Sequence, residues 1–346
     1  MSIFFVSCGQ NISTSETQNP STQEQTTQTS ENSEVQVQES EISETEKILV
    51  TSSIIPLSSI ANFIGGDYVE VNNIVPAGVS PHGFDLSARQ MIDIETSEIV
   101  FMVGLDHIDG FLEKAVPEEK QIHLADGLGL LEASEHEHDE DEHSDDEHAD
   151  EEHSDEEHAD EEHDEEHSDE HSEELHEQDP HVWLGKENVM TIVEKVRDEL
   201  SAIMPEQAEY FSENTESFKI EIEKVYNDFA SETEGKTPTE FIVFHDAYNY
   251  LLQSIGMDEN LKIPFSENVF QETGTAHMAE LIEEVELHGV THVFREPQFS
   301  DGNLQKFVDE YNLDLGTLDP LGTDTSANGY LDNIKNNLAE LSNVYE

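Results

Sequence analysis

Short β-branched runs and amphipathic helical patterns alternate along the first part of the chain. The apolar run at residues 48–55 ends at Pro56. A helical pattern at 57–64 follows and ends at Gly65 and Gly66. Further elements are predicted as a strand at 69–75, a helix at 89–97, and strands at 99–103 and 122–124, with a loop at 104–109. Strands that alternate with helices in this way predict a parallel, doubly wound sheet.

The last third of the chain repeats this alternation. Strands are predicted at 241–244, 261–264, 291–294 and 315–318. Helices are predicted between and after them, at 248–255, 276–288, 304–312 and 329–344. We therefore expect a second parallel sheet of the same kind.

Two amphipathic helices are predicted between these halves, at 187–203 and at 206–234. The second carries Phe218, Ile222 and Phe229 at near-helical spacing, and it is long for a simple crossover. We therefore predict an α/β fold in which two (β/α) lobes with parallel sheets are joined by a single long helix. The expected division is an N-terminal lobe at 47–204, a linking helix at 205–234 and a C-terminal lobe at 235–346.

A histidine-rich acidic segment at 132–178 interrupts the first lobe. It contains ten histidines, many Asp and Glu residues, and no Lys or Arg. From His138 to His163 the histidines recur every fifth residue, which is about 500° of helical rotation, so they would not share one helix face. Two windows match the H-x-x-E-H pattern of some zinc peptidases, but they lack the apolar face that such a helix needs. We expect a disordered loop that binds divalent cations loosely and exchanges them quickly.

The charge balance excludes some partners. The chain has 14 Lys and Arg against 81 Asp and Glu, which gives a formal net charge of -67. Nucleic acid is therefore not an expected partner, because its phosphates require basic side chains. The same balance argues against binding to an anionic membrane surface.

The single cysteine, Cys8, excludes a disulfide within one chain. It follows a short apolar run, M-S-I-F-F-V-S, which resembles the end of a bacterial lipoprotein signal that has been truncated. The polar tract after it lacks core residues and is typical of a disordered tether. We expect residues 1–46 to be this signal and tether, with a lipid on Cys8 anchoring the protein to a membrane.

Several side chains able to bind a metal follow predicted strands. His82, His245, Glu296 and Asp319 come after four different strands, and His181 lies where the chain re-enters the fold. Ligands of open parallel sheets bind beyond the carboxyl ends of the strands, so we expect these residues to converge in the cleft between the lobes. Three imidazoles and a carboxylate suit zinc. For each residue an ordinary structural role is the alternative, such as a turn cap for Asp319 or a solvated loop carboxylate for Glu296.

Five short motifs resemble one known family, the zinc-binding branch of the metal-binding solute-binding proteins of ABC importers. They are S-P-H-G-F at His82, D-P-H-V-W-L at His181, F-H-D-A-Y at His245, E-P-Q-F at Glu296 and L-D-P-L-G at Asp319. The resemblance implies two lobes with a metal between them. It implies that His82, His181 and His245 are ligands and that Asp319 stands at the fourth position, with water or an acidic side chain completing the shell.

The resemblance also implies a function without catalysis. A receptor outside the cytoplasmic membrane, expected to be monomeric, would capture Zn²⁺ and deliver it to an ABC permease. This chain has no G-x-x-x-x-G-K-[ST] motif, so the ATPase would be a separate subunit. Manganese-binding relatives place Glu where this chain has His245, which makes Mn²⁺ the less favoured metal. The alternatives are a manganese or iron receptor, a zinc buffer or chaperone not coupled to transport, and a zinc hydrolase, which would need a general base on a structured element.

Overall fold

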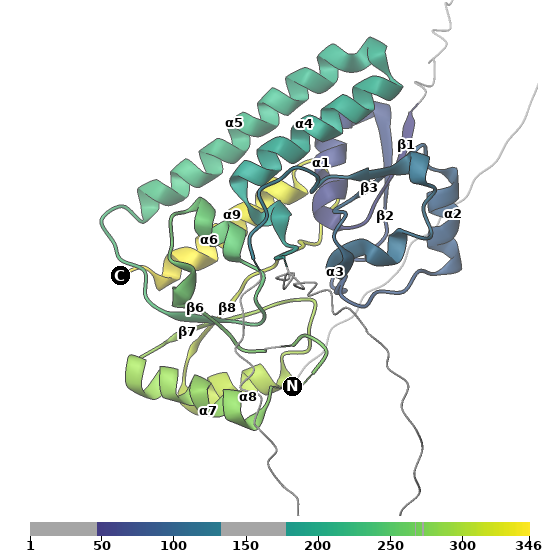
Figure 1. The fold of residues 1–346 in the computed structure, drawn as a ribbon. Helices are drawn as coiled ribbons and strands as arrows, with labels where there is room; N and C mark the ends of the chain where they lie inside the picture. Colours follow the sequence, from purple (N-terminus) through teal and green to yellow (C-terminus); the bar gives the residue numbers. More distant parts are fainter. Residues whose placement is uncertain (1–46, 133–177, 267, 272) are drawn as a thin grey trace, which may run out of the picture. The chain divides into compact units, whose positions relative to one another are not determined.

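Two parallel four-stranded sheets organise the computed structural model, which describes residues 47–132, 178–266, 268–271 and 273–346 (Figure 1). The first sheet has the order β2-β1-β3-β4, with β1 Ile48–Ser52, β2 Val69–Asn73, β3 Ile99–Met102 and β4 Gln121–His123. The second has the order β6-β5-β7-β8, with β5 Phe241–Val243, β6 Lys262–Pro264, β7 His292–Arg295 and β8 Asp314–Thr317. The predicted α/β fold with two parallel sheets is confirmed. The predictions for residues 1–46 and for 133–177 lie outside the described residues.

The helices fall close to their predicted positions. They are α1 Ile55–Gly65, α2 Ala88–Thr96, α3 Asp106–Asp109, α4 Lys186–Ile203, α5 Ala208–Glu232, α6 Asn249–Ser254, α7 Thr275–Glu283, α8 Gly302–Tyr311 and α9 Gly329–Leu341. The short helix α3 lies in a stretch predicted as a loop. Helix α2 begins with a capping box, in which the Ser87 side chain accepts from the Gln90 main-chain N–H and the Gln90 side chain accepts from the Ser87 N–H.

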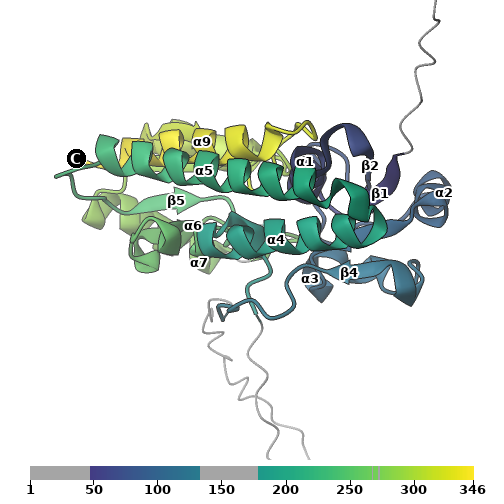
Figure 2. The same cartoon turned by 90° about the horizontal axis from the view of Figure 1, so that it is seen from above.

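The long helix predicted between the halves is present as α5, which follows a 3-10 turn at Pro205–Gln207. Figure 2 shows α4, α5 and α9 running side by side, and α5 also packs on α1. The segment before α9 is hydrogen-bonded to α1, because the Ser59 hydroxyl donates to the Ser326 carbonyl at 2.7 Å and accepts from the Tyr330 N–H at 2.8 Å. Two helices therefore connect the halves, namely the long helix α5 and the C-terminal helix α9.

The second sheet is buried on both faces. Along β5, Phe241 and Val243 belong to the large core shared with the first half, whereas Ile242 belongs to a second core. This second core includes Leu281 of α7 and Leu304 of α8, the two helices that cover that face in Figure 1. Neighbouring residues of a strand point to opposite faces, so burial on both sides requires an uninterrupted apolar strand.

None of the helices in the part of the chain that the structure describes is long and apolar enough to cross a membrane.

Candidate metal centre

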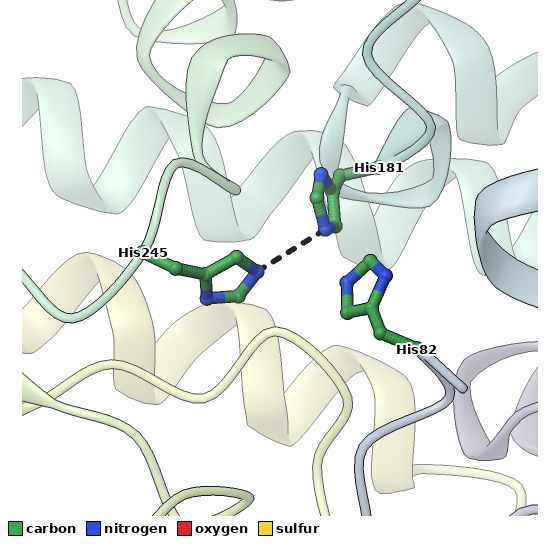
Figure 3. Close-up of side chains that lie close together, drawn as sticks. All are labelled: His82, His181 and His245. Carbon is green, nitrogen blue, oxygen red and sulfur yellow. Dashed lines mark hydrogen bonds between the residues drawn. The ribbon is translucent and has the colours of Figure 1, made fainter. Parts of the chain in front are cut away.

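Three histidines from different loops come together in the structure. His82 lies after β2, His181 directly precedes a 3-10 turn at Val182–Leu184, and His245 lies two residues after β5. One nitrogen from each imidazole lies within 4.8 Å of the other two (Figure 3). The ring centroids are 5.3 to 5.7 Å apart. The structure thus brings together the three histidines selected from the sequence.

An oxygen acceptor holds the Nδ1 atom of each ring. The Nδ1–H of His82 donates to the His107 carbonyl at 2.9 Å, that of His181 to Asp179 Oδ1 at 2.8 Å, and that of His245 to Glu296 Oε1 at 2.8 Å. Because a carbonyl or carboxylate oxygen can only accept, the proton of each ring is on Nδ1. The Nε2 atom of each ring therefore carries a lone pair that is free to bind a metal.

Two of these lone pairs face each other. The Nε2 atoms of His181 and His245 are 3.4 Å apart. Two zinc ligands at the usual Zn–N distance, placed at two corners of a tetrahedron, are separated by about 3.3 Å. The pair therefore has the spacing of two zinc ligands, and His82 offers a nitrogen within 4.8 Å of both rings.

The register of the second sheet places His245 against its acceptor. Strands β5 and β7 are neighbours, with Val243 paired to Phe294, and two further residues along each strand lead to His245 and Glu296. Glu296 Oε1 accepts from both the main-chain N–H of His245 at 3.2 Å and its ring. Glu296 is only 2% exposed. It is therefore not the solvated loop carboxylate considered from the sequence, because the fold buries it beneath His245.

Asp179 holds His181 in a similar way, and sequence reasoning missed it. Its Oδ1 accepts from the main-chain N–H of His181 at 3.0 Å as well as from the ring, and its Oδ2 accepts from the Asn249 side chain at 3.1 Å. Burial raises the pKa of Asp179, but the hydrogen bonds and charge interaction with His181 outweigh this effect and lower it overall. The signal was present in the sequence as a carboxylate two residues before a candidate ligand.

The loop that carries His82 depends on glycine. Gly78 and Gly83 have φ angles of 73° and 71°, which favour a residue without Cβ. The His107 carbonyl that holds His82 comes from α3, the stretch predicted as a loop. A main-chain acceptor of this kind has no signature in the sequence. His82 is half-buried, whereas His181 and His245 are buried.

Burial keeps the rings of His82 and His181 uncharged. Burial, together with the neighbouring His181 and His245, lowers the pKa of His82 to about 3. The pKa of His181 is also lowered, mainly by burial, although Asp179 opposes this effect. Both rings are therefore neutral at pH 7, which is the form that binds a metal.

The pocket at the three rings is small and mostly apolar. The cavity has a volume of about 10 Å³, which is room for one water molecule or one ion. Besides the histidines it is lined by Ser80, Pro81, Trp183, Gln298, Phe299, Pro320 and Leu321. Trp183, the single tryptophan of the chain, lies with its ring centroid 5.5 Å from that of His181.

Asp319 does not join the three imidazoles in the structure. Its Oδ1 accepts hydrogen bonds from the main-chain N–H groups of Leu321 at 3.0 Å and Gly322 at 2.8 Å, and from the Gln298 side chain at 2.7 Å. It therefore caps the turn, which is the structural alternative considered from the sequence. Within the described residues, the group of possible ligands at this site consists of the three histidines. Gln298, which connects Asp319 to the pocket, was not selected from the sequence.

A second group of possible ligands lies on the surface of the C-terminal half and consists of Glu240, Glu284 and His288. His288 is 53% exposed, and its Nδ1 is 2.6 Å from Glu284 Oε2. The Glu284 carboxylate raises the pKa of His288, so an ordinary surface ion pair accounts for this group.

Two parallel-sheet lobes with three imidazoles meeting at strand ends define a metal-binding solute-binding protein. Comparison with known proteins agrees with this class. The chain belongs to the family described as zinc-uptake complex component A, periplasmic, whose model matches residues 50–344.

Relatives of known name extend over most of the chain. It is 36% identical over 289 residues to the high-affinity zinc uptake system protein ZnuA of Haemophilus influenzae, covering 79% of this chain and 85% of the relative. It is 33% identical over 290 residues to the ZnuA protein of Brucella abortus, covering 81% and 85%. A crystal structure of ZnuA superimposes with a TM-score of 0.68 at 25% identity, covering 86% of this chain and 99% of that chain.

Proposed function

We propose that this protein is an extracytoplasmic receptor that binds Zn²⁺ through His82, His181 and His245 and delivers it to an ABC permease. One observation carries the proposal. The two unprotonated Nε2 atoms of His181 and His245 face each other at 3.4 Å, an arrangement that is repulsive until a cation lies between them. The relatives named as high-affinity zinc uptake proteins support both the metal and the coupling to a permease.

The donor set favours zinc over manganese. Three neutral imidazoles suit zinc, whereas manganese prefers more oxygen ligands. The three nitrogens leave the fourth tetrahedral position to a water molecule or to the second carboxylate oxygen of Asp319. The proposed function includes no chemical reaction, so the residues only bind the ion and release it.

The position of His82 suggests how the ion leaves. His181 and His245 are buried and each is held by a buried carboxylate, whereas His82 is half-buried and held by a main-chain carbonyl. Separation of the loop after β2 from the other two loops would remove one ligand of three. The remaining pair would hold zinc much less tightly, so the permease would receive the ion when it separates the loops.

The ends of the histidine-rich segment lie close to the site. Glu132 and Gln178 form an antiparallel bridge, and the Tyr250 hydroxyl accepts from the Leu131 N–H and donates to the Asp179 carbonyl, both at 2.9 Å. Asp179 is the residue that holds the ring of His181. We propose that the segment collects zinc next to this site and that the metal then passes to the tighter three-histidine centre.

Metal analysis and calorimetry of the purified protein test the proposal. The wild type should contain one tightly bound zinc, and His82→Ala, His181→Ala and His245→Ala should each lose it. His288→Ala, on the surface, is the matched control and should retain it. Deletion of residues 134–178 should remove several weak sites and leave the tight one. Tight zinc binding that survives any of the three pocket substitutions would refute the proposed site.

Membrane attachment is tested separately. We propose that a lipid on Cys8 tethers the receptor, which acts as a monomer beside its permease and a separate ATPase subunit. Cys8→Ser should then move the protein from the membrane fraction to the soluble fraction without changing its zinc affinity. Membrane attachment that persists in this variant would contradict the lipid anchor.

A further inference from the structure

A buried cation contacts the loop that carries His245. Lys262 is the only buried Lys or Arg among the residues that the structure describes, and its side chain is 3% exposed. It begins the edge strand β6, and its Nζ contacts the carboxylate of Asp246, the residue directly after His245. A buried ammonium group is expensive unless it is paired, so this contact holds Asp246 and the loop of His245 in place.

Lys262 also acts on the other buried ligand. Burial lowers the pKa of Lys262, the negative charge of Asp179 opposes this effect, and the net result is a pKa of about 8. Asp179 is the acceptor that fixes the ring of His181. One ammonium group therefore interacts with carboxylates that adjoin two of the three proposed ligands.

Negative charges outnumber positive ones around the site. Asp179, Asp246 and Glu296 are carboxylates that adjoin the proposed ligands or hold their rings, and Asp319 is a fourth carboxylate, held beside the pocket by Gln298. Lys262 is the buried cation that offsets part of this negative charge.

We propose that Lys262 is a positioning residue that sets the charge around the metal and keeps zinc binding weak enough for release. The inference rests on the proposed zinc site. Without the ammonium group, the carboxylates near the site would lack this compensating charge, so a divalent ion would be held more tightly and released more slowly. A receptor that must give up its cargo requires the compensating charge.

Substitution of the pair tests this role, with Zn²⁺ itself as the probe and the full chain at pH 7. Lys262→Met should lower the Kd for zinc at least about tenfold and slow dissociation, because a unit charge near a divalent ion is removed. The same variant should melt at a lower temperature without metal, because Asp246 loses its partner. Asp246→Asn should weaken zinc binding. The double variant should return to within about threefold of the wild-type Kd.

A purely structural role would give a different pattern. If Lys262 only supports the fold, Lys262→Met should weaken zinc binding or leave it unchanged, and either result would overturn the proposal. Lys262→Arg keeps the charge and should keep the wild-type affinity, and Lys262→Gln repeats the test if the Met variant does not fold. Lys306→Met, which removes an exposed lysine from α8, is the matched control and should not alter the Kd.

Different results would refute the proposed zinc site and the proposed role of Lys262. The proposed site fails if His245→Ala still binds zinc tightly. The charge inference fails if the wild type binds zinc through the three histidines but Lys262→Met does not bind it more tightly. A chelator that buffers free zinc at low concentration restricts both measurements to the tight site.

Discussion

The strongest test of how the site is built is Glu296→Gln, which keeps the shape of the side chain and removes its charge. Glu296 is 2% exposed and accepts from both the ring and the main chain of His245. A hydrogen bond to a charged group contributes about 1.5–3 kcal/mol, and the loss of such a partner of a metal ligand typically weakens metal binding about 10- to 100-fold. We therefore expect the Kd for zinc to rise by this factor. A larger loss, on the order of a thousandfold, is expected if Glu296 is itself a ligand.

Competition between the protein and a zinc chelator gives the required Kd. Trp183 is a built-in reporter, because the chain has one tryptophan and its ring centroid lies 5.5 Å from that of His181. Glu286→Gln, which changes an exposed glutamate, is the matched control and should bind zinc as the wild type does. A Glu296→Gln variant with a Kd within threefold of the wild type would show that the charge of Glu296 does not strengthen zinc binding by His245.

Four further predictions follow from the same structure. Gly83→Ala should destabilise the fold by about 1 kcal/mol or more, seen as a lower melting temperature, and should weaken zinc binding, because φ is +71° and the new Cβ would lie 2.9 Å from the ring of Phe270. Asp319→Asn should raise the Kd for zinc less than any His→Ala change in the pocket, and an equal loss in calorimetry would identify Asp319 as a full ligand. The low pKa of His82 means that protons compete poorly for its ring, so dialysis at pH 5.5 should leave the tight zinc bound, although free imidazole (pKa about 6.5) is mostly protonated there. The stability of the metal-free protein should decrease as pH falls from about 6.5 toward 3. In this range His82 binds a proton in the unfolded chain but stays unprotonated in the folded protein. A melting temperature that is constant over this range would contradict the prediction.

Much of the fold could be predicted because its strands are buried on both faces and its helices are amphipathic. An apolar run such as that of β1 predicts a buried strand, and the helical spacing of apolar residues along α5 predicts which face of the helix is buried. The short helix α3 was missed because four residues do not complete enough turns to show a period. The packing of α9 against α1 could not be foreseen either, since an amphipathic pattern shows that one face is buried but does not show what covers it.

The three imidazoles could be predicted because the carboxyl ends of parallel strands share one edge. Their acceptors were harder to predict. The His107 carbonyl belongs to the main chain and leaves no trace in the sequence, while Glu296 was noticed as a possible ligand and instead holds His245. A carboxylate near a metal can bind the ion or bind its ligand, and only the direction of the side chain decides between these roles.

The way each ring is held also gives a physical reason why the proposed site would bind zinc tightly and still release it. Neutral imidazoles contribute no charge, so the attraction for the ion comes from carboxylates that lie behind the rings, such as Asp179 and Glu296. Lys262 moderates that attraction, and the half-buried His82 provides a ligand that can leave without disturbing the other two. Affinity and release are therefore coupled, and a substitution that strengthens zinc binding is expected to slow its release.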